Sequence, residues 1–155
     1  MRVLFIDPGR VTGWFAVDFK QWIWSGGELP HTEFLTWMDT TSLVSPLRVY
    51  ELDRVVAEHF DITAQTAQMV RATDPLWAVE QVGCLRFWCG QLGLPFAEQP
   101  RTAKGFDKDG AKLKKLGWWK PADGVKGEAG HRRDAARHAL KWGVDHGAID
   151  AGRLL

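Results

Sequence analysis

The sequence from Val3 to Trp14 reads VLFIDPGRVTGW, and it decides how the rest of the chain is interpreted. Its first four residues are apolar without interruption, which is typical of a strand buried on both faces. Asp7 follows at the point where this strand ends, so a carboxylate is placed at the edge of the core. The Pro-Gly pair after it is a turn signal, and the apolar pattern then resumes, which predicts a hairpin into a second strand. Taken alone, such a turn can be purely structural, because Asp often accepts a bond from a nearby backbone N–H.

The composition is typical of an ordinary globular protein. With 155 residues, 45% hydrophobic and 25% charged, residues 1–155 are expected to form a single domain with a substantial core. Cys84 and Cys89 have a spacing that suits neither a metal knuckle nor a disulfide, so we expect free buried thiols. There is no apolar run of about 18 residues, and the N-terminus enters a strand at once. We therefore expect no membrane span, no signal peptide and a cytoplasmic protein.

Charge is distributed unevenly along the chain. Residues 1–100 carry 7 Lys and Arg against 12 Asp and Glu, whereas residues 101–142 carry 12 against 5. A basic segment on an acidic chain favours a phosphate-rich partner that meets one side of the molecule. The alternative is that this segment is only a solvated surface.

The order of predicted elements is three strands, a helix, a strand, a helix, a strand and a closing helix. We predict strands over 3–6, 12–17 and 21–25 as an antiparallel meander that ends at Gly26-Gly27, then a helix over 32–38 that Thr32 caps. A fourth strand follows over 54–58, a long helix over 75–93 and a short fifth strand over 94–98. A Lys-rich segment to Lys120 and a flexible connection over 121–130 lead to a helix over 129–143.

Two further stretches repeat the pattern of an acid at the edge of the core. Arg54 to Glu58 reads RVVAE, an apolar strand with a carboxylate at its end. In the last helix, His131 and Asp134 are three residues apart and therefore neighbours on one face. Alanines that follow offer a small-residue face for close packing on a sheet. By itself the His-x-x-Asp pair can equally be a surface ion pair.

Together these side chains form a donor set that suits a divalent metal ion. Hard oxygen and imidazole ligands that converge at one sheet edge are what Mg²⁺ or Mn²⁺ requires. Two such ions about 4 Å apart can activate a water and stabilise the leaving oxygen of a phosphodiester. The predicted ligands are Asp7, Glu58, His131 and Asp134.

The element order and these motifs resemble a known family. The chain resembles the ribonuclease H-like fold of the retroviral integrase superfamily and, within it, the RuvC family of Holliday junction resolvases, in particular the small RuvC-like endonucleases of bacteriophages. The likeness extends from Arg2 to about Gly143. It is carried by Asp7-Pro8-Gly9 with Thr12-Gly13-Trp14, Val56-Ala57-Glu58, Gln99-Pro100-x-x-Ala103-Lys104, and His131-x-x-Asp134-Ala135-x-x-His138-Ala139.

The resemblance implies a fold and a set of roles. It implies an α/β fold with a mixed five-stranded sheet flanked by helices, and metal-binding carboxylates at Asp7, Glu58 and Asp134. His131 stands where the family has Asp or His, as a ligand or as a general acid/base. Lys104 matches the basic residue that offsets phosphate charge in the transition state. Phe60 matches an aromatic wedge at the junction centre, with a spacing one residue shorter than in the bacterial enzymes.

The function implied is magnesium-dependent hydrolysis of Holliday junctions, by two Mg²⁺ or Mn²⁺ ions per site, to 5′-phosphate and 3′-hydroxyl ends. No nucleotide cofactor is expected, and a phage-encoded protein would act in the host cytoplasm. Because a four-way junction has two symmetry-related strands to cut, a homodimer is expected, with the apolar helix 75–93 as its interface. The candidate DNA-contacting residues are Phe60, Arg101, Lys104, Lys112, Lys114, Lys115, Arg132 and Arg133.

Three alternatives remain at this point. The strand-Asp-x-Gly opening is shared with ATP-binding proteins of the actin and sugar-kinase fold, but 155 residues cannot hold their two lobes. The same fold and metals can act on forks, flaps or RNA:DNA hybrids, because the ions contact only phosphate. The third alternative is a branched-DNA-binding module without catalysis.

Overall fold

The computed structural model describes residues 1–40, 51–60, 76–120 and 130–154. Its centre is a five-stranded mixed sheet in the order β3-β2-β1-β4-β5. The strands are β1 (Arg2–Asp7), β2 (Val11–Asp18), β3 (Ile23–Pro30), β4 (Arg54–Glu58) and β5 (Phe96–Gln99). The first three strands are antiparallel neighbours, and β4 and β5 run parallel to β1.

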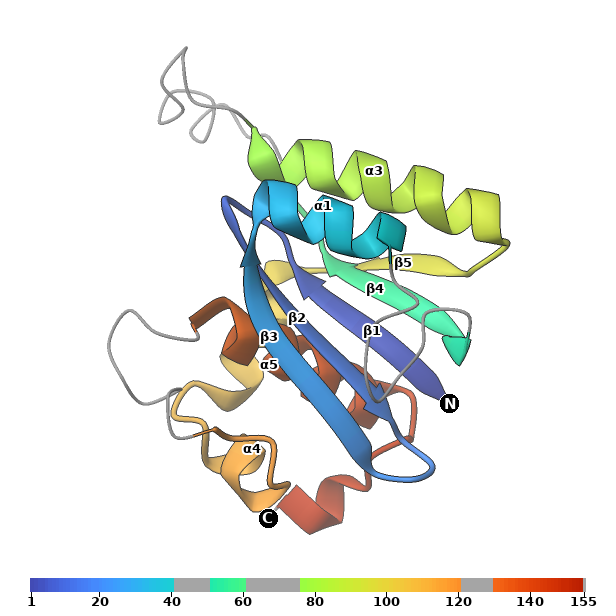
Figure 1. Ribbon diagram of the computed structural model, residues 1–155. Helices are drawn as coiled ribbons and strands as arrows, with labels where there is room; N and C mark the ends of the chain where they lie inside the picture. Colours follow the sequence, from blue (N-terminus) through green and yellow to red (C-terminus); the bar gives the residue numbers. More distant parts are fainter. Residues whose placement is uncertain (41–50, 61–75, 121–129, 155) are drawn as a thin grey trace.

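Helices cover both faces of this sheet (Figure 1). On one face lie α1 (His31–Thr40) and α3 (Trp77–Leu92), and on the other lies α5 (Gly130–Asp145). Shorter elements pack beside α5, namely the 3₁₀ helices η2 (Arg101–Asp107) and η4 (Ala151–Leu154) and the short helix α4 (Ala111–Lys115). The sheet is thereby enclosed between two helical layers.

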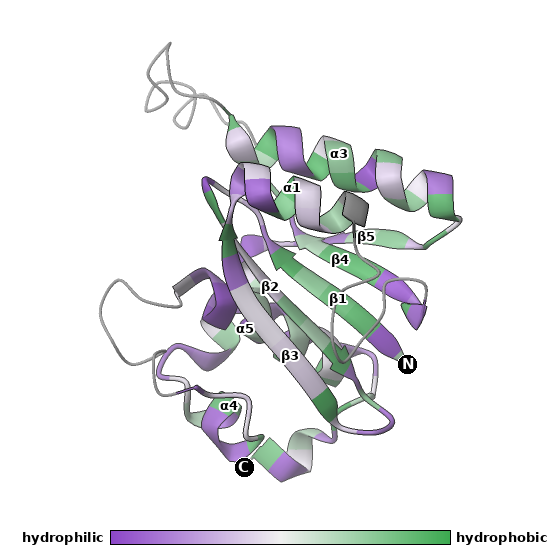
Figure 2. Cartoon of the chain, viewed as in Figure 1, coloured by the Kyte–Doolittle hydropathy of each residue, from purple (hydrophilic) through white to green (hydrophobic). Residues whose placement is uncertain are grey.

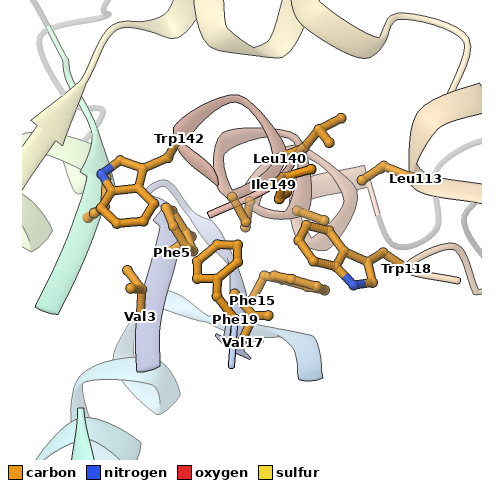
Figure 3. Packing of buried hydrophobic residues seen from close by; sticks show 14 of the residues in the cluster. Val3, Phe5, Phe15, Val17, Phe19, Leu113, Trp118, Leu140, Trp142 and Ile149 are labelled. Carbon is orange, nitrogen blue, oxygen red and sulfur yellow. The ribbon is translucent and has the colours of Figure 1, made fainter. Parts of the chain in front are cut away.

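The central strand β1 is buried on both faces, as its apolar run predicts. Val3 and Phe5 point to the α5 side, whereas Leu4 and Ile6 point to the α1 and α3 side. On the α5 side an aromatic cluster fills the core, with Phe5 against Trp142 at 5.8 Å between ring centroids (Figure 3). Hydrophobic residues dominate β1 and β4, between the helices (Figure 2). Because these two strands are fixed by packing, their ends are fixed as well.

The third strand differs from the prediction. It runs through Gly26 and Gly27 to Pro30 instead of ending at the glycines. A Cβ at Gly26 would lie 2.9 Å from the backbone oxygen of Trp14 and 3.3 Å from Cγ of Arg132, and one at Gly27 would lie 3.2 Å from the Trp14 ring. The glycines therefore do not break the strand; they make room for large side chains beside it.

Other boundaries differ by a few residues. Helix α1 begins at His31, directly after Pro30, so Thr32 lies inside it. Strand β5 is shifted two residues toward the C-terminus at its start, and α3 ends as expected, with Gly93 in the left-handed region at φ 62°. Pro75 and most of the predicted connection 121–130 lie outside the described residues.

The structure also bears on the expectations for the two cysteines and for membrane spans. Cys84 and Cys89 are both free, with Cys89 buried and Cys84 half-buried. Burial raises the pKa of the Cys89 thiol to about 11, so it is an inert core residue. Among the helices that the structure describes, none combines the length and the apolar character needed to cross a bilayer.

Candidate metal centre

The parallel pairing of β1 and β4 brings two carboxylates to the same edge of the sheet. Asp7 is the last residue of β1 and Glu58 is the last residue of β4. Ile6 pairs with Ala57 in the register, so the two acids follow side by side at the next position. Both are buried despite their charge. A buried carboxylate requires compensating partners, which the surrounding elements supply.

Helix α5 comes to this edge because its first turn lies directly on β2. A Cβ at Gly13 would be 2.0 Å from the carbonyl carbon and oxygen of His131, so the backbones touch there. The backbone N–H of Arg132 donates to Oε1 of Glu28 on β3 at 2.9 Å, which satisfies one free group of the first turn. Since Gly13 is the register partner of Asp7, His131 and Asp134 arrive beside the end of β1.

The ammonium group of Lys104 lies among the three carboxylates. Its Nζ is 2.8 Å from Oδ1 of Asp7, 2.6 Å from Oε2 of Glu58 and 3.3 Å from Oδ2 of Asp134. These acids come from β1, β4 and α5, and Lys104 itself comes from η2. Burial alone would lower the pKa of Lys104, but the charges and hydrogen bonds of Asp7 and Glu58 raise it. The Lys104 side chain is therefore protonated and positively charged.

Further cations border the same acids. Nδ1 of His131 lies 2.8 Å from Oδ2 of Asp7, and this hydrogen bond raises the pKa of His131 against the opposing effect of its partial burial. The guanidinium of Arg137 donates to Oδ1 of Asp134 at 2.8 Å. Arg101 is 79% exposed, with Nε 3.7 Å from Oε1 of Glu58. Each acid is thus held by at least one basic side chain.

Glu58 has a second, buried partner that the predicted ligand set missed. Nε2 of His138 lies 2.9 Å from its Oε2, and Nδ1 lies 3.1 Å from the side-chain oxygen of Gln99 at the end of β5. Burial would raise the pKa of Glu58, but hydrogen bonds from His138 and Lys104 outweigh it and lower the pKa to about 2. A signal was present in the sequence, because His138 is one helical turn after Asp134.

Gln81 on α3 is a second missed residue. It is fully buried, and its Oε1 accepts from the backbone N–H of Gly9 at 3.2 Å and from the Thr12 hydroxyl at 3.0 Å. These bonds fix the turn that follows Asp7. Nothing in the sequence distinguishes this glutamine from a solvated helical residue.

Comparisons with known proteins identify the fold. No protein-family model matches the sequence, and no curated protein matches it significantly. Among solved structures, Thermus thermophilus RuvC matches with a TM-score of 0.57 at 17% identity, over 96% of this chain and 98% of that one. T. thermophilus RuvC in complex with Holliday junction substrate matches with a TM-score of 0.58 at 17% identity, over 96% and 97%. The chain has the RuvC fold.

The RuvC fold confirms the predicted α/β architecture of a mixed five-stranded sheet with flanking helices. The three carboxylates and His131, predicted as metal ligands, meet at one edge of that sheet. Among the described residues, no three His, Cys, Asp or Glu side chains hold an open position for an ion as they stand, and Lys104 lies between the acids. The donor set nonetheless suits a hard divalent ion, since three carboxylates from three elements already surround one positive group.

The predicted DNA-contacting residues differ from one another in exposure. Arg101, Lys114 and Lys115 are exposed, whereas Phe60, Arg133 and Lys112 are half-buried. The Nζ of Lys112 donates to the carbonyl of Phe106 at 3.1 Å. Lys104 is engaged by the acids. Exposed basic residues therefore lie at the centre itself and on α4.

The assignment of Arg132 to DNA contact is wrong in this structure. The residue is 2% exposed, its guanidinium lies 5.8 Å from the Trp24 ring centroid, and NH1 donates to the carbonyl of Trp118 at 3.3 Å. Desolvation by burial lowers its pKa to about 10, so it is a charged residue of the core. Its burial between the exposed His131 and the half-buried Arg133 could not be predicted from charge alone.

Proposed function

We propose that this protein is a metal-dependent endonuclease that cuts branched DNA, with the four-way Holliday junction as its main substrate. The observation that carries the proposal is the meeting of Asp7, Glu58 and Asp134 within 3.3 Å of one ammonium nitrogen. The likeness to a RuvC bound to a Holliday junction supports the choice of substrate. We take residues 1–155 as one such endonuclease domain.

The residues that would hold the metal are Asp7, Glu58 and Asp134, with His131 as a further ligand or as a group that carries a proton. One or two Mg²⁺ or Mn²⁺ ions bound there would supply charge stabilisation at the phosphodiester and a water of lowered pKa. Glu58 is ionised at any ordinary pH, because its pKa is held at about 2. It is therefore in the state that a metal ligand needs.

Each other residue of the centre has a definable task. His138 fixes the Glu58 carboxylate, Arg137 fixes Asp134, and Gln81 fixes the turn after Asp7. Lys104 supplies a positive charge beside the scissile phosphate. The oxygen of water forms the new bond to phosphorus and the bond to O3′ breaks, which leaves a 5′-phosphate and a 3′-hydroxyl.

Exposed basic residues support the proposed contact with DNA. Exposed Arg101, Lys114 and Lys115 would contact phosphates, which makes the affinity for DNA depend on salt concentration.

We propose a homodimer through the outer side of α3, where Phe87 is 70% exposed and Val79 and Leu92 are also exposed. A monomer by light scattering that still cuts both strands of a junction would contradict this part.

The deciding experiment compares the wild type with Asp7→Asn on a labelled four-way junction. We expect the variant to bind the junction but to have lost magnesium-dependent nicking, because a carboxylate that would hold the metal is gone while the basic surface is intact. Retained nicking in a nuclease-free preparation would remove Asp7 from the chemistry. A parallel set of fork, flap, hybrid and linear substrates tests the choice of junction, and a faster reaction on one of them would replace it.

A non-catalytic junction binder is the alternative that must be separated. An ion that binds the folded state raises the thermal midpoint in a concentration-dependent way. We expect Mg²⁺ or Mn²⁺ to raise the wild-type midpoint and to have a smaller effect on Asp7→Asn. Junction binding without any metal response or nicking would favour the binder.

A further inference from the structure

We propose that the ammonium group of Lys104 is a built-in counter-ion, which holds the three carboxylates together when no divalent ion is bound and is displaced when one binds. Lys104 would then determine the concentration of divalent ion at which the centre becomes occupied. This inference rests on the proposed function in one respect, that the three acids form a metal centre.

Three negative charges lie close together at this centre. Asp7 and Glu58 are buried neighbours, and like charges in such a position repel each other strongly. Asp134 adds a third negative charge from α5. The Nζ of Lys104 contacts one oxygen of each acid, at 2.8, 2.6 and 3.3 Å. Among the described residues, it is the cation in contact with all three, so it takes the place where an added cation would be stabilised most.

Two arginines also lie near these acids. Arg137 is anchored away from Asp7 and Glu58, because its Nε and NH2 donate to the carbonyls of Asp107 and Lys108 at 2.8 and 2.7 Å. Arg101 is mostly exposed and reaches Glu58 alone. Neither guanidinium can replace the Lys104 ammonium between the acids.

The Lys104 side chain has room to move toward solvent. Lys104 approaches the acids from η2 on a flexible four-carbon stem, and its side chain is 20% exposed, at the border of solvent. A rotation of this stem can move the ammonium outward without any shift of the strands that carry Asp7 and Glu58. In the metal-bound protein the displaced ammonium would remain at the solvent-exposed border of the metal centre, where a DNA phosphate would bind.

Two opposite effects follow from removal of the lysine. The acids lose their compensating charge, so the metal-free protein becomes less stable. The incoming ion no longer competes with an ammonium group, so its affinity rises. A lysine that served packing or DNA contact alone would produce the first effect or neither, but not the second.

The test uses the full chain without DNA. Mn²⁺ binding is measured by electron paramagnetic resonance for the wild type, Lys104→Met and the control Lys20→Met, which removes an exposed lysine at the turn before β3. We expect Lys104→Met to bind Mn²⁺ at least about tenfold more tightly than the wild type. Its thermal midpoint in EDTA should be lower, and its rise on addition of Mn²⁺ larger. Lys20→Met should resemble the wild type.

The outcomes separate the two proposals. Unchanged or weaker Mn²⁺ affinity in Lys104→Met, with junction cutting by the wild type intact, overturns the counter-ion role alone. A wild type that binds Mn²⁺ but cuts no branched DNA overturns the nuclease and leaves the counter-ion role standing. Lys104→Gln is measured in parallel, so that the affinity comparison can still be made if the Met variant folds poorly. A variant that folds only with Mn²⁺ supports the proposal, and absence of Mn²⁺ binding in all variants overturns it.

Discussion

Nε2 of His138 lies 2.9 Å from Oε2 of Glu58, and both side chains are buried between α5 and the sheet. A carboxylate can only accept, so this ring nitrogen donates the hydrogen bond. The other ring nitrogen lies 3.1 Å from the side-chain oxygen of Gln99, which is the register partner of Glu58 on β5. The imidazole therefore holds the position and the orientation of a predicted metal ligand without itself being one.

We expect His138→Phe to weaken Mn²⁺ binding by about 10- to 100-fold, the usual effect of removing a group that orients a ligand. The polar atoms left without a partner should also cost about 1–3 kcal/mol of unfolding free energy. His138→Gln retains a donor and should recover part of the affinity. Mn²⁺ titration and urea unfolding measure the two effects, and an unchanged affinity in the Phe variant would show that Glu58 needs no support from His138.

The contact between Gly13 and His131 gives a second prediction. A methyl group at position 13 would lie 2.0 Å from the His131 carbonyl, so Gly13→Ala must push the start of α5 away from β2. We expect a loss of about 1–3 kcal/mol in stability, as for overpacked cores, together with weaker Mn²⁺ binding because Asp134 moves with the helix. Gly83→Ala on α3 is the control, since its Cβ would meet nothing within 4 Å. That change should stabilise the helix slightly. Equal effects of the two changes would contradict the close packing of α5.

The acids at the strand ends could be predicted because their signal is local. An uninterrupted apolar run followed by a carboxylate places Asp7 and Glu58 at the edge of the core. The parallel pairing of β1 and β4 then places the two carboxylates side by side. The His-x-x-Asp spacing likewise places two polar groups on one face of α5. These features depend on residues that are close in the sequence.

What the sequence could not predict depends on contacts between distant elements. The glycines of β3 indicate a strand end unless Trp14 and Arg132 are known to lie beside them. Arg132 is read as exposed from its charge, yet its burial beside Trp24 follows from the rotation of α5 on the sheet. The position of Lys104 among three acids likewise requires η2, which no periodic pattern identifies.

Gln81 links the middle of α3 to the turn after Asp7, which gives a third prediction. Gln81→Ala leaves the half-buried N–H of Gly9 and the buried Thr12 hydroxyl without this partner, so we expect a loss of about 1–3 kcal/mol. Mn²⁺ affinity should fall as well, because the turn no longer fixes Asp7. Gln91→Ala, an exposed change on the same helix, should alter neither quantity. Thermal unfolding with and without Mn²⁺ checks both, and parallel losses at both positions would refute a specific role for Gln81.

Asp18 gives a prediction about pH that is independent of the metal centre. Burial would raise the pKa of this carboxyl, but hydrogen bonds from Arg2 Nε at 2.9 Å and from the backbone of Lys20 and Gln21 lower it. A lowered pKa contributes stability above the unfolded value of about 3.9, and that stability is lost as the pH falls through the folded value. Asp18→Asn should therefore be less stable than the wild type at pH 7, and the difference should shrink below pH 4. A difference that persists in acid would show that shape, not charge, matters at this position.

Lys114 and Lys115 on α4 test the proposed path of the DNA. Both are exposed, and Nζ of Lys114 lies 4.6 Å from the Trp119 ring centroid, which orients it. If both contact phosphate, replacing them with Ala should lower the slope of log affinity against log salt by about 0.9 for each residue. Binding should weaken equally for duplexes of different sequence, because phosphate contacts carry no sequence information. Lys20→Ala, at the exposed turn before β3, should leave the slope unchanged. Fluorescence anisotropy at several salt concentrations measures the slope. An unchanged slope in the double variant would place the DNA away from α4 and closer to Arg101 at the start of η2.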